Sequence, residues 1–75
     1  MATWEVSLFA YLRDRHGPSI TIEAVANPRA ILQALAIAGV SVESCRLAVG
    51  DEFANLDDDV PVGSQLALIP PVSGG

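Results

Sequence analysis

The chain of 75 residues is long enough for one small domain and too short for two. About half of the residues are hydrophobic (51%), which specifies a core, but a domain of this size buries only about 60% of the surface that its unfolded chain exposes. A deep cleft with its own catalytic machinery is therefore hard to accommodate. We expect a module that works inside the active site of another protein.

The charge and the composition limit the partners. A formal net charge of −5 argues against a nucleic-acid-binding protein, because neutralising phosphates requires clustered Lys and Arg, and it favours a protein partner with a basic docking surface. The single cysteine, Cys45, cannot form an intramolecular disulfide, which points to a reducing compartment. The N-terminus does not have the pattern of a signal peptide, and the longest apolar stretch, residues 34–40, is too short to cross a bilayer. We expect a cytoplasmic protein that binds neither nucleic acid nor membrane.

The first third of the chain predicts two antiparallel strands with a short helical connection. In residues 4–10 the apolar side chains fall on alternate positions, which is typical of a half-buried strand, and Phe9 falls on the polar face. Residues 11–16 predict about one helical turn, which ends at a Gly-Pro turn signal. Residues 19–25 alternate again and predict the second strand.

The next segment predicts the only long helix. Asn27 suits the N-cap and Pro28 the first helical position, so the helix should begin there, and Gly39 predicts its end. The apolar residues between them, which recur at helical spacing and must cover a sheet, are Ile31, Leu32, Leu35 and Ala38.

The remaining residues predict three further strands. Residues 46–50 form a short strand, residues 51–55 a turn and a brief strand, and residues 65–69 the last strand. The order of elements predicts an α+β fold, in which one long helix packs on one face of a mixed sheet. The β-grasp arrangement fits best, with the first and last strands adjacent and parallel at the sheet centre.

The C-terminal segment is the most informative part of the sequence. We expect a β-grasp domain of residues 1–71 and a flexible Gly-Gly tail of residues 72–75. A proline cannot donate to a strand ladder, so the sheet should stop at the Pro-Pro pair, which projects the tail away from the body. Glycines have no Cβ, so they can thread a channel too narrow for other residues. The residues expected to thread such a channel are Pro70, Pro71, Val72, Ser73 and Gly74.

A carboxylate at the end of such a tail, on Gly75, has a chemical use. A carboxylate reacts with nucleophiles only after one of its oxygens has become a leaving group, and adenylation by ATP achieves this. A sulfur donor can then replace AMP and leave a thiocarboxylate. That group is a good sulfur nucleophile at neutral pH, and the tail can present it deep inside a second enzyme.

These segments together resemble a known family. Residues 66–75 (LALIPPVSGG) resemble the signature end of the small subunit of molybdopterin synthase, a ubiquitin-like sulfur carrier. Residues 8–17 (LFAYLRDRHG) are similar to the first strand and short helix of that family, and residues 48–53 resemble its middle strands. Two departures, at residues 50–51 and 63–65, fall in turns, which tolerate such changes. They bear on the fit to a partner rather than on the chemistry of the tail.

The resemblance implies a non-catalytic, sulfur-donating subunit of molybdopterin synthase, with the activity in a large subunit and a heterotetrameric assembly. An ATP-dependent adenylyltransferase would activate Gly75, and the thiocarboxylate would then donate sulfur to a pyranopterin precursor in molybdenum cofactor biosynthesis. ATP would be consumed by the activating enzyme. The chain itself is expected to bind no cofactor and no metal.

Three large apolar side chains predict the partner-binding surface. Phe9, Phe53 and Ile69 fall on the outward side of the predicted sheet, and exposed apolar patches often mark interfaces. In the resembling family, the matching positions dock on both the activating enzyme and the synthase. A slip of one residue in the strand register would instead place these side chains in the core.

Other chemistries have weaker support, and three other functions stay open. Cys45 is of a residue type that is often simply buried, His16 has no companion at ligand spacing, and residues 57–59 lack the spaced ligands and turn glycine of a calcium loop. The chain could instead be a sulfur carrier for thiazole or amino-acid synthesis, which would share the fold and the Gly-Gly end. It could also be a protein modifier that forms isopeptide bonds, or a plain interaction domain whose last two glycines are dispensable.

Overall fold

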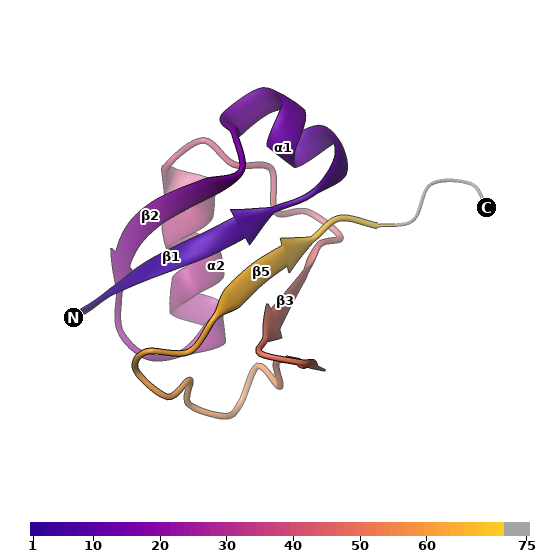
Figure 1. Ribbon diagram of the computed structural model, residues 1–75. Helices are drawn as coiled ribbons and strands as arrows, with labels where there is room; N and C mark the ends of the chain where they lie inside the picture. The colour runs from indigo at the N-terminus through magenta and orange to yellow at the C-terminus, as the bar shows by residue number, and fades with distance from the viewer. Residues whose placement is uncertain (72–75) are drawn as a thin grey trace.

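The computed structural model describes residues 1–71, in which five strands and two helices form two layers. The elements are β1 (Ala2–Leu8), α1 (Ala10–His16), β2 (Ser19–Ala24), α2 (Pro28–Ile37), β3 (Arg46–Val49), β4 (Glu52–Phe53) and β5 (Leu66–Ile69). The strands form one mixed sheet in the order β2-β1-β5-β3-β4, and α2 lies across one face of it (Figure 1). This is the α+β, β-grasp arrangement that the sequence predicts.

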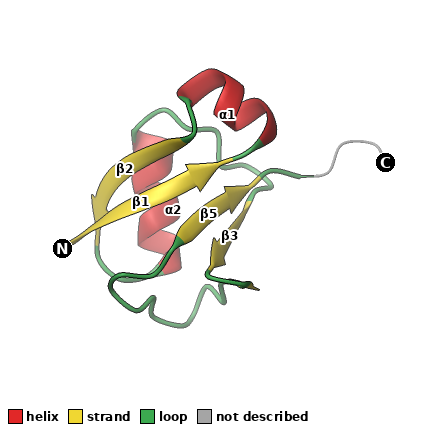
Figure 2. Cartoon of the chain, in the orientation of Figure 1, coloured by secondary structure: helices red, strands yellow, loops and turns green. Residues whose placement is uncertain are grey.

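The centre of the sheet is the parallel pair β1 and β5, as expected. Val6 is opposite Leu66 and Leu8 is opposite Leu68, whereas the other neighbouring strands are antiparallel. The arrows of β1 and β5 accordingly point the same way in Figure 2. Because both strands end at the same edge of the sheet, α1 begins beside the point where the chain leaves β5. We call this edge the tail end of the domain.

The alternation in the strands places one set of side chains under α2. Trp4 is buried there, and its indole Nε1 donates a hydrogen bond of 3.0 Å to the carbonyl of Ala24, so that its polar atom is satisfied inside the core. The other buried apolar side chains of the core are Val6, Leu8, Leu12, Ile22, Ala24, Ile31, Leu35, Val40, Leu47, Val60, Leu66 and Leu68.

Helix α2 begins as the sequence predicts. The Asn27 side-chain oxygen accepts hydrogen bonds from the backbone N–H groups of Arg29 (2.9 Å) and Ala30 (3.3 Å), which satisfies two donors that the first turn leaves free. The helix stops at Ile37. Gly39 follows with φ of +95°, a left-handed conformation that glycine adopts without steric cost. Ala38, predicted to extend the apolar stripe, is exposed and caps the helix instead.

The first strand and the first helix differ from the prediction in their bounds. β1 ends at Leu8 rather than at residue 10, and α1 is two turns long rather than one. Phe9 still has extended backbone angles, but Ala10 has φ of +52°, so the chain turns abruptly out of the sheet there. Leu12 is fully buried, and α1 thus closes the tail end of the core. Within residues 1–71, neither helix is long and apolar enough to cross a membrane.

Candidate functional site

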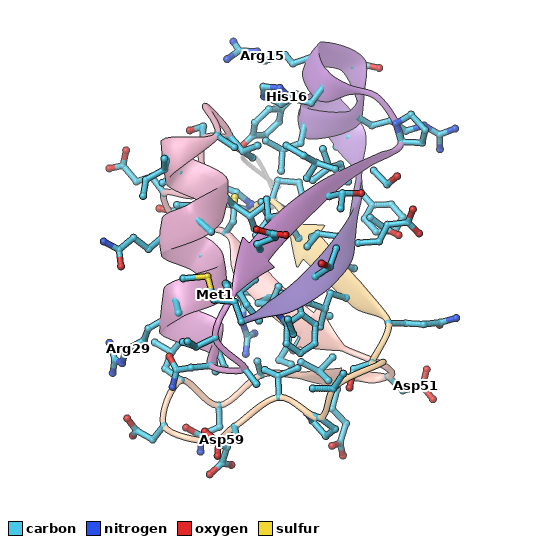
Figure 3. All side chains as sticks on the ribbon, turned by 90° about the vertical axis from the view of Figure 1, so that its left-hand side faces the viewer. Met1, Arg15, His16, Arg29, Asp51 and Asp59 are labelled. Carbon is cyan, nitrogen blue, oxygen red and sulfur yellow. The ribbon has the colours of Figure 1, made fainter. Side chains whose placement is uncertain are left out.

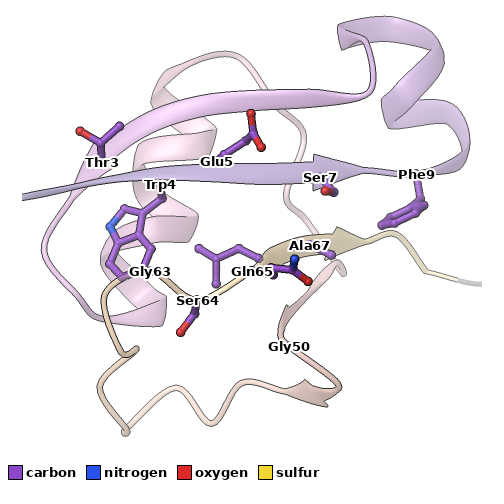
Figure 4. A pocket seen from close by; sticks show the side chains of 11 residues that line it. Thr3, Trp4, Glu5, Ser7, Phe9, Gly50, Gly63, Ser64, Gln65 and Ala67 are labelled. Carbon is purple, nitrogen blue, oxygen red and sulfur yellow. The ribbon is translucent and has the colours of Figure 1, made fainter.

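The face of the sheet that α2 leaves uncovered is the first part of the candidate site, and we call it the open face. The register places Ser7, Ala67 and Ala48 in one row across β1, β5 and β3. Small side chains in this row leave a shallow groove of about 540 Å³ beside it, which Glu5 and Gln65 also line (Figure 4). The row of small side chains and the shallow groove beside it therefore leave the centre of the open face without large protruding side chains.

Large apolar side chains border this flat strip. Phe9 lies at the end of the groove, and its side chain is 44% exposed. Phe53 on β4 is paired with Ala48 on β3, and its side chain is 50% exposed. Ile69 is half-buried at the tail end, whereas the preceding Leu68 is fully buried. The register is therefore the expected one, and these three side chains are not part of the buried core. Their part in docking stays a prediction.

An arginine that the sequence reasoning did not single out joins this surface. The guanidinium carbon of Arg46 lies 3.7 Å from the centre of the Phe53 ring, a cation–π contact. Arg46 is opposite Ile69 on β5, and Ala48 is opposite Phe53 on β4, so Arg46 is a diagonal rather than a direct neighbour of Phe53. Only the pairing of three strands brings the two side chains together.

The exit of the tail is the second part of the candidate site. β5 ends at Ile69, so the sheet stops before Pro70, as predicted. Pro70 is half-buried and Pro71 exposed. The predicted threading residues Val72, Ser73 and Gly74, and the predicted reactive residue Gly75, lie outside the described residues.

Cys45 has the environment of an unreactive thiol. The side chain is half-buried, and its sulfur donates a weak hydrogen bond of 3.5 Å to the Ser41 carbonyl. Burial raises the pKa of the Cys45 thiol above its ordinary value. A hydrogen bond with the Tyr11 hydroxyl lowers this pKa, but by less than burial raises it. At neutral pH the sulfur is therefore protonated, and the thiol is a weaker nucleophile than the thiolate.

The remaining candidates from the sequence do not gather into a site. In the part of the chain that the structure describes, no group of three or more His, Cys, Asp or Glu side chains is placed to hold a metal ion. Asp57 of the acidic loop forms an ion pair with Arg29, with 3.5 Å between Nη2 and the carboxylate oxygen, and both side chains are exposed. Such exposed pairs contribute little to stability.

The fold is that of the ubiquitin-like sulfur carriers. Residues 6–75 match the ThiS family, and the chain belongs to this family. Among solved structures, the chain is similar to SAMP1 from Haloferax volcanii, with a TM-score of 0.74 and 27% identity over 99% of this chain and all of that chain. It is also similar to a chain in the complex of subunits 1 and 2 of molybdopterin-converting factor from Helicobacter pylori 26695. The TM-score there is 0.62, with 29% identity over 97% of this chain and 99% of that chain. No curated protein matches the chain.

Proposed function

We propose that the chain carries sulfur for molybdenum cofactor biosynthesis on the carboxylate of Gly75. The observation that carries this proposal is the likeness, over nearly the whole chain, to one chain in the complex of subunits 1 and 2 of molybdopterin-converting factor. The end of the chain supports the same function. The central strand β5 leads into Pro70 and Pro71, and Gly74 and Gly75 follow in the sequence.

The proposed cycle begins with activation of the carboxylate. One oxygen of Gly75 attacks the α-phosphorus of ATP held by an adenylyltransferase, and pyrophosphate leaves. Sulfide then attacks the carbonyl carbon, AMP leaves with the electron pair of the C–O bond, and a thiocarboxylate remains. In the large subunit this sulfur attacks an electrophilic carbon of the pyranopterin precursor, and an oxygen substituent leaves that carbon with the electron pair of the C–O bond. Water then cleaves the acyl–sulfur bond, which leaves sulfur on the pterin and restores the carboxylate.

In this proposal the domain positions the tail, and both partner enzymes supply the reactive sites. The open face, with Phe9, Phe53 and Ile69, docks on the adenylyltransferase and on the large subunit in turn, the latter in a heterotetramer. Four extended residues after Pro71 span about 13 Å, enough to reach a site below the surface of a partner. ATP belongs to the activating enzyme, and the chain itself binds no cofactor.

Mass spectrometry of the intact chain tests the proposal. Incubated with the adenylyltransferase of the same organism, ATP and sulfide, the chain should gain the mass difference between one sulfur and one oxygen atom. Addition of the large subunit and precursor should return the chain to its original mass as molybdopterin forms. A variant without Gly75 should stay unmodified and unfold at the same temperature as the full chain. A chain that never acquires sulfur under these conditions would overturn the proposal.

A second candidate function is protein modification, which the likeness to SAMP1 favours, because a second solved structure of that protein calls it small archaeal modifier protein 1. A modifier would form an amide between the Gly75 carbonyl and an amine of another protein. The chain contains no Lys, so it could not form lysine-linked chains on itself. Conjugates in cell extracts, without any thiocarboxylate, would favour this function over sulfur transfer.

A further inference from the structure

Arg46 is placed to contact a partner while it rests on Phe53. The guanidinium face lies over the ring, at 3.7 Å from its centre. Stacking of this kind occupies the face of the planar group and leaves the N–H donors at its edge free for a further hydrogen bond. Arg46 is exposed, and within residues 1–71 no carboxylate oxygen lies within 4 Å of its nitrogens.

The charges of the domain are divided between its two ends. Arg13 and Arg15 belong to α1, and Arg46 begins β3, so three of the four arginines lie at the tail end. Figure 3 shows Arg15 at one end of the molecule and Arg29, Asp51 and Asp59 at the other. The acidic residues at that other end are Glu23, Asp51, Glu52, Asp57, Asp58 and Asp59. Asp14 of α1 and Glu43, which precedes β3, also lie at the tail end, so three arginines and two carboxylates of the described residues meet there. This end of the domain is therefore far less acidic than the net charge of the chain suggests.

We propose that Arg46 is a specificity residue of the open face, and that the protein receiving the tail places a carboxylate against its guanidinium. This inference rests on the proposed function, since it concerns the protein surface that the tail enters. Ile69 and Phe53 lie on either side of Arg46, so a partner that covers them also removes water from the guanidinium. A charge buried without a counter-charge is strongly unfavourable, whereas a paired one discriminates between partners. The partner surface is thus apolar with an acidic residue, not basic.

Calorimetric titration of the full chain with the molybdopterin synthase large subunit of the same organism tests this inference. Arg46→Met keeps an apolar side chain on Phe53 but removes the charge, and it should weaken binding about tenfold or more. Arg46→Glu should weaken binding further, because two carboxylates then face each other. Arg29→Glu is the matched control: it makes the same charge change at an exposed site at the opposite end, and it should leave binding within about twofold.

The outcomes separate this inference from the proposed function. Unchanged or tighter binding of Arg46→Met would show that the arginine merely covers the ring, and it would overturn the inference alone. Equal weakening by Arg46→Glu and Arg29→Glu would show a general effect of net charge and would also overturn it. No binding of the unaltered chain to the large subunit would contradict the proposed function, and the inference with it. Circular dichroism of each variant establishes that it is folded before it is titrated.

Discussion

Strand β5 has two faces with different exposure, although their residues alternate along four positions of the chain. Leu66 and Leu68 are buried under α2, whereas Ala67 and Ile69 on the open face are half-buried. Because successive side chains of a strand point to opposite sides, one short segment contributes to the core and to the exposed surface at once. The two faces can therefore change independently. Substitutions on the helix face should alter stability, and substitutions on the open face should alter docking.

The largest expected effect is on the helix face. Leu68→Ala should destabilise the domain by about 2–5 kcal/mol, because the side chain is fully buried and its removal leaves a cavity. A domain of this size has a small margin of stability, so the variant should be partly unfolded at room temperature. Ile69→Ala, one residue further, should cost clearly less in urea denaturation. Equal costs for the two would mean that the faces are not distinct.

A smaller effect on stability, but a large one on binding, is expected from the open face. Ile69→Arg should weaken binding to the large subunit and to the adenylyltransferase at least about tenfold, because a docked partner would bury an unpaired guanidinium. Ile37→Arg makes the same substitution at the exposed end of α2 and should leave binding unchanged. Unfolding of Ile69→Arg alone would show that this side chain belongs to the core.

Substitutions at Asn27, the N-cap of α2, should change the stability of the domain without changing its binding to a partner. Asn27→Ala should cost about 1 kcal/mol, because two backbone N–H groups lose the side-chain oxygen that accepts from them. Asn27→Ser retains an acceptor and should restore most of the loss. Urea denaturation measures both variants. If Asn27→Ala alters binding to the large subunit while it remains folded, the helix face also takes part in docking.

The smallest expected effect is the pH dependence that Cys45 contributes. The folded state raises the pKa of this thiol, so its contribution to stability is fully present below the ordinary value near 9 and is lost as pH rises through the raised value. Melting temperatures of the unaltered chain should therefore fall more between about pH 8 and 10 than those of Cys45→Ser. Sulfur transfer by Cys45→Ser should equal that of the unaltered chain. A folded Cys45→Ser variant that transfers no sulfur would place the thiol in the mechanism.

The sequence predicted those parts of the fold that depend on periodicity. The alternation around Trp4 and the spacing of Ile31 and Leu35 are direct consequences of burial on one side, so strand faces and the main helix were predictable. The end of β1 was not, because alternation continues through Phe9 while the backbone has already left the sheet. Only the turn at Ala10 marks this exit, and nothing in the residue type announces it.

The sequence predicted the apolar residues of the candidate site, but it did not predict that the Arg46 side chain joins them. Phe53 and Ile69 were expected on the outward side, and they lie there. The contact of Arg46 with Phe53 depends on the twist and pairing of three strands, which a linear pattern does not contain. The uneven distribution of charge between the two ends is likewise a property of the topology, whereas the net charge alone favoured a basic docking surface on the partner.

The parallel pairing of β1 with β5 also sets the order of events in folding. Val6 pairs with Leu66, so the pairing of β1 with β5 closes a loop of nearly the whole chain. Because closing a long loop costs conformational entropy, we expect this pairing to form late in folding. β5 lies between β1 and β3, so the sheet stays in two separate pieces until β5 is in place. A nascent chain that has not yet released residues 66–69 cannot complete its core. If the open face is the docking surface, as proposed above, a partner that binds it would therefore select completed domains over unfinished chains.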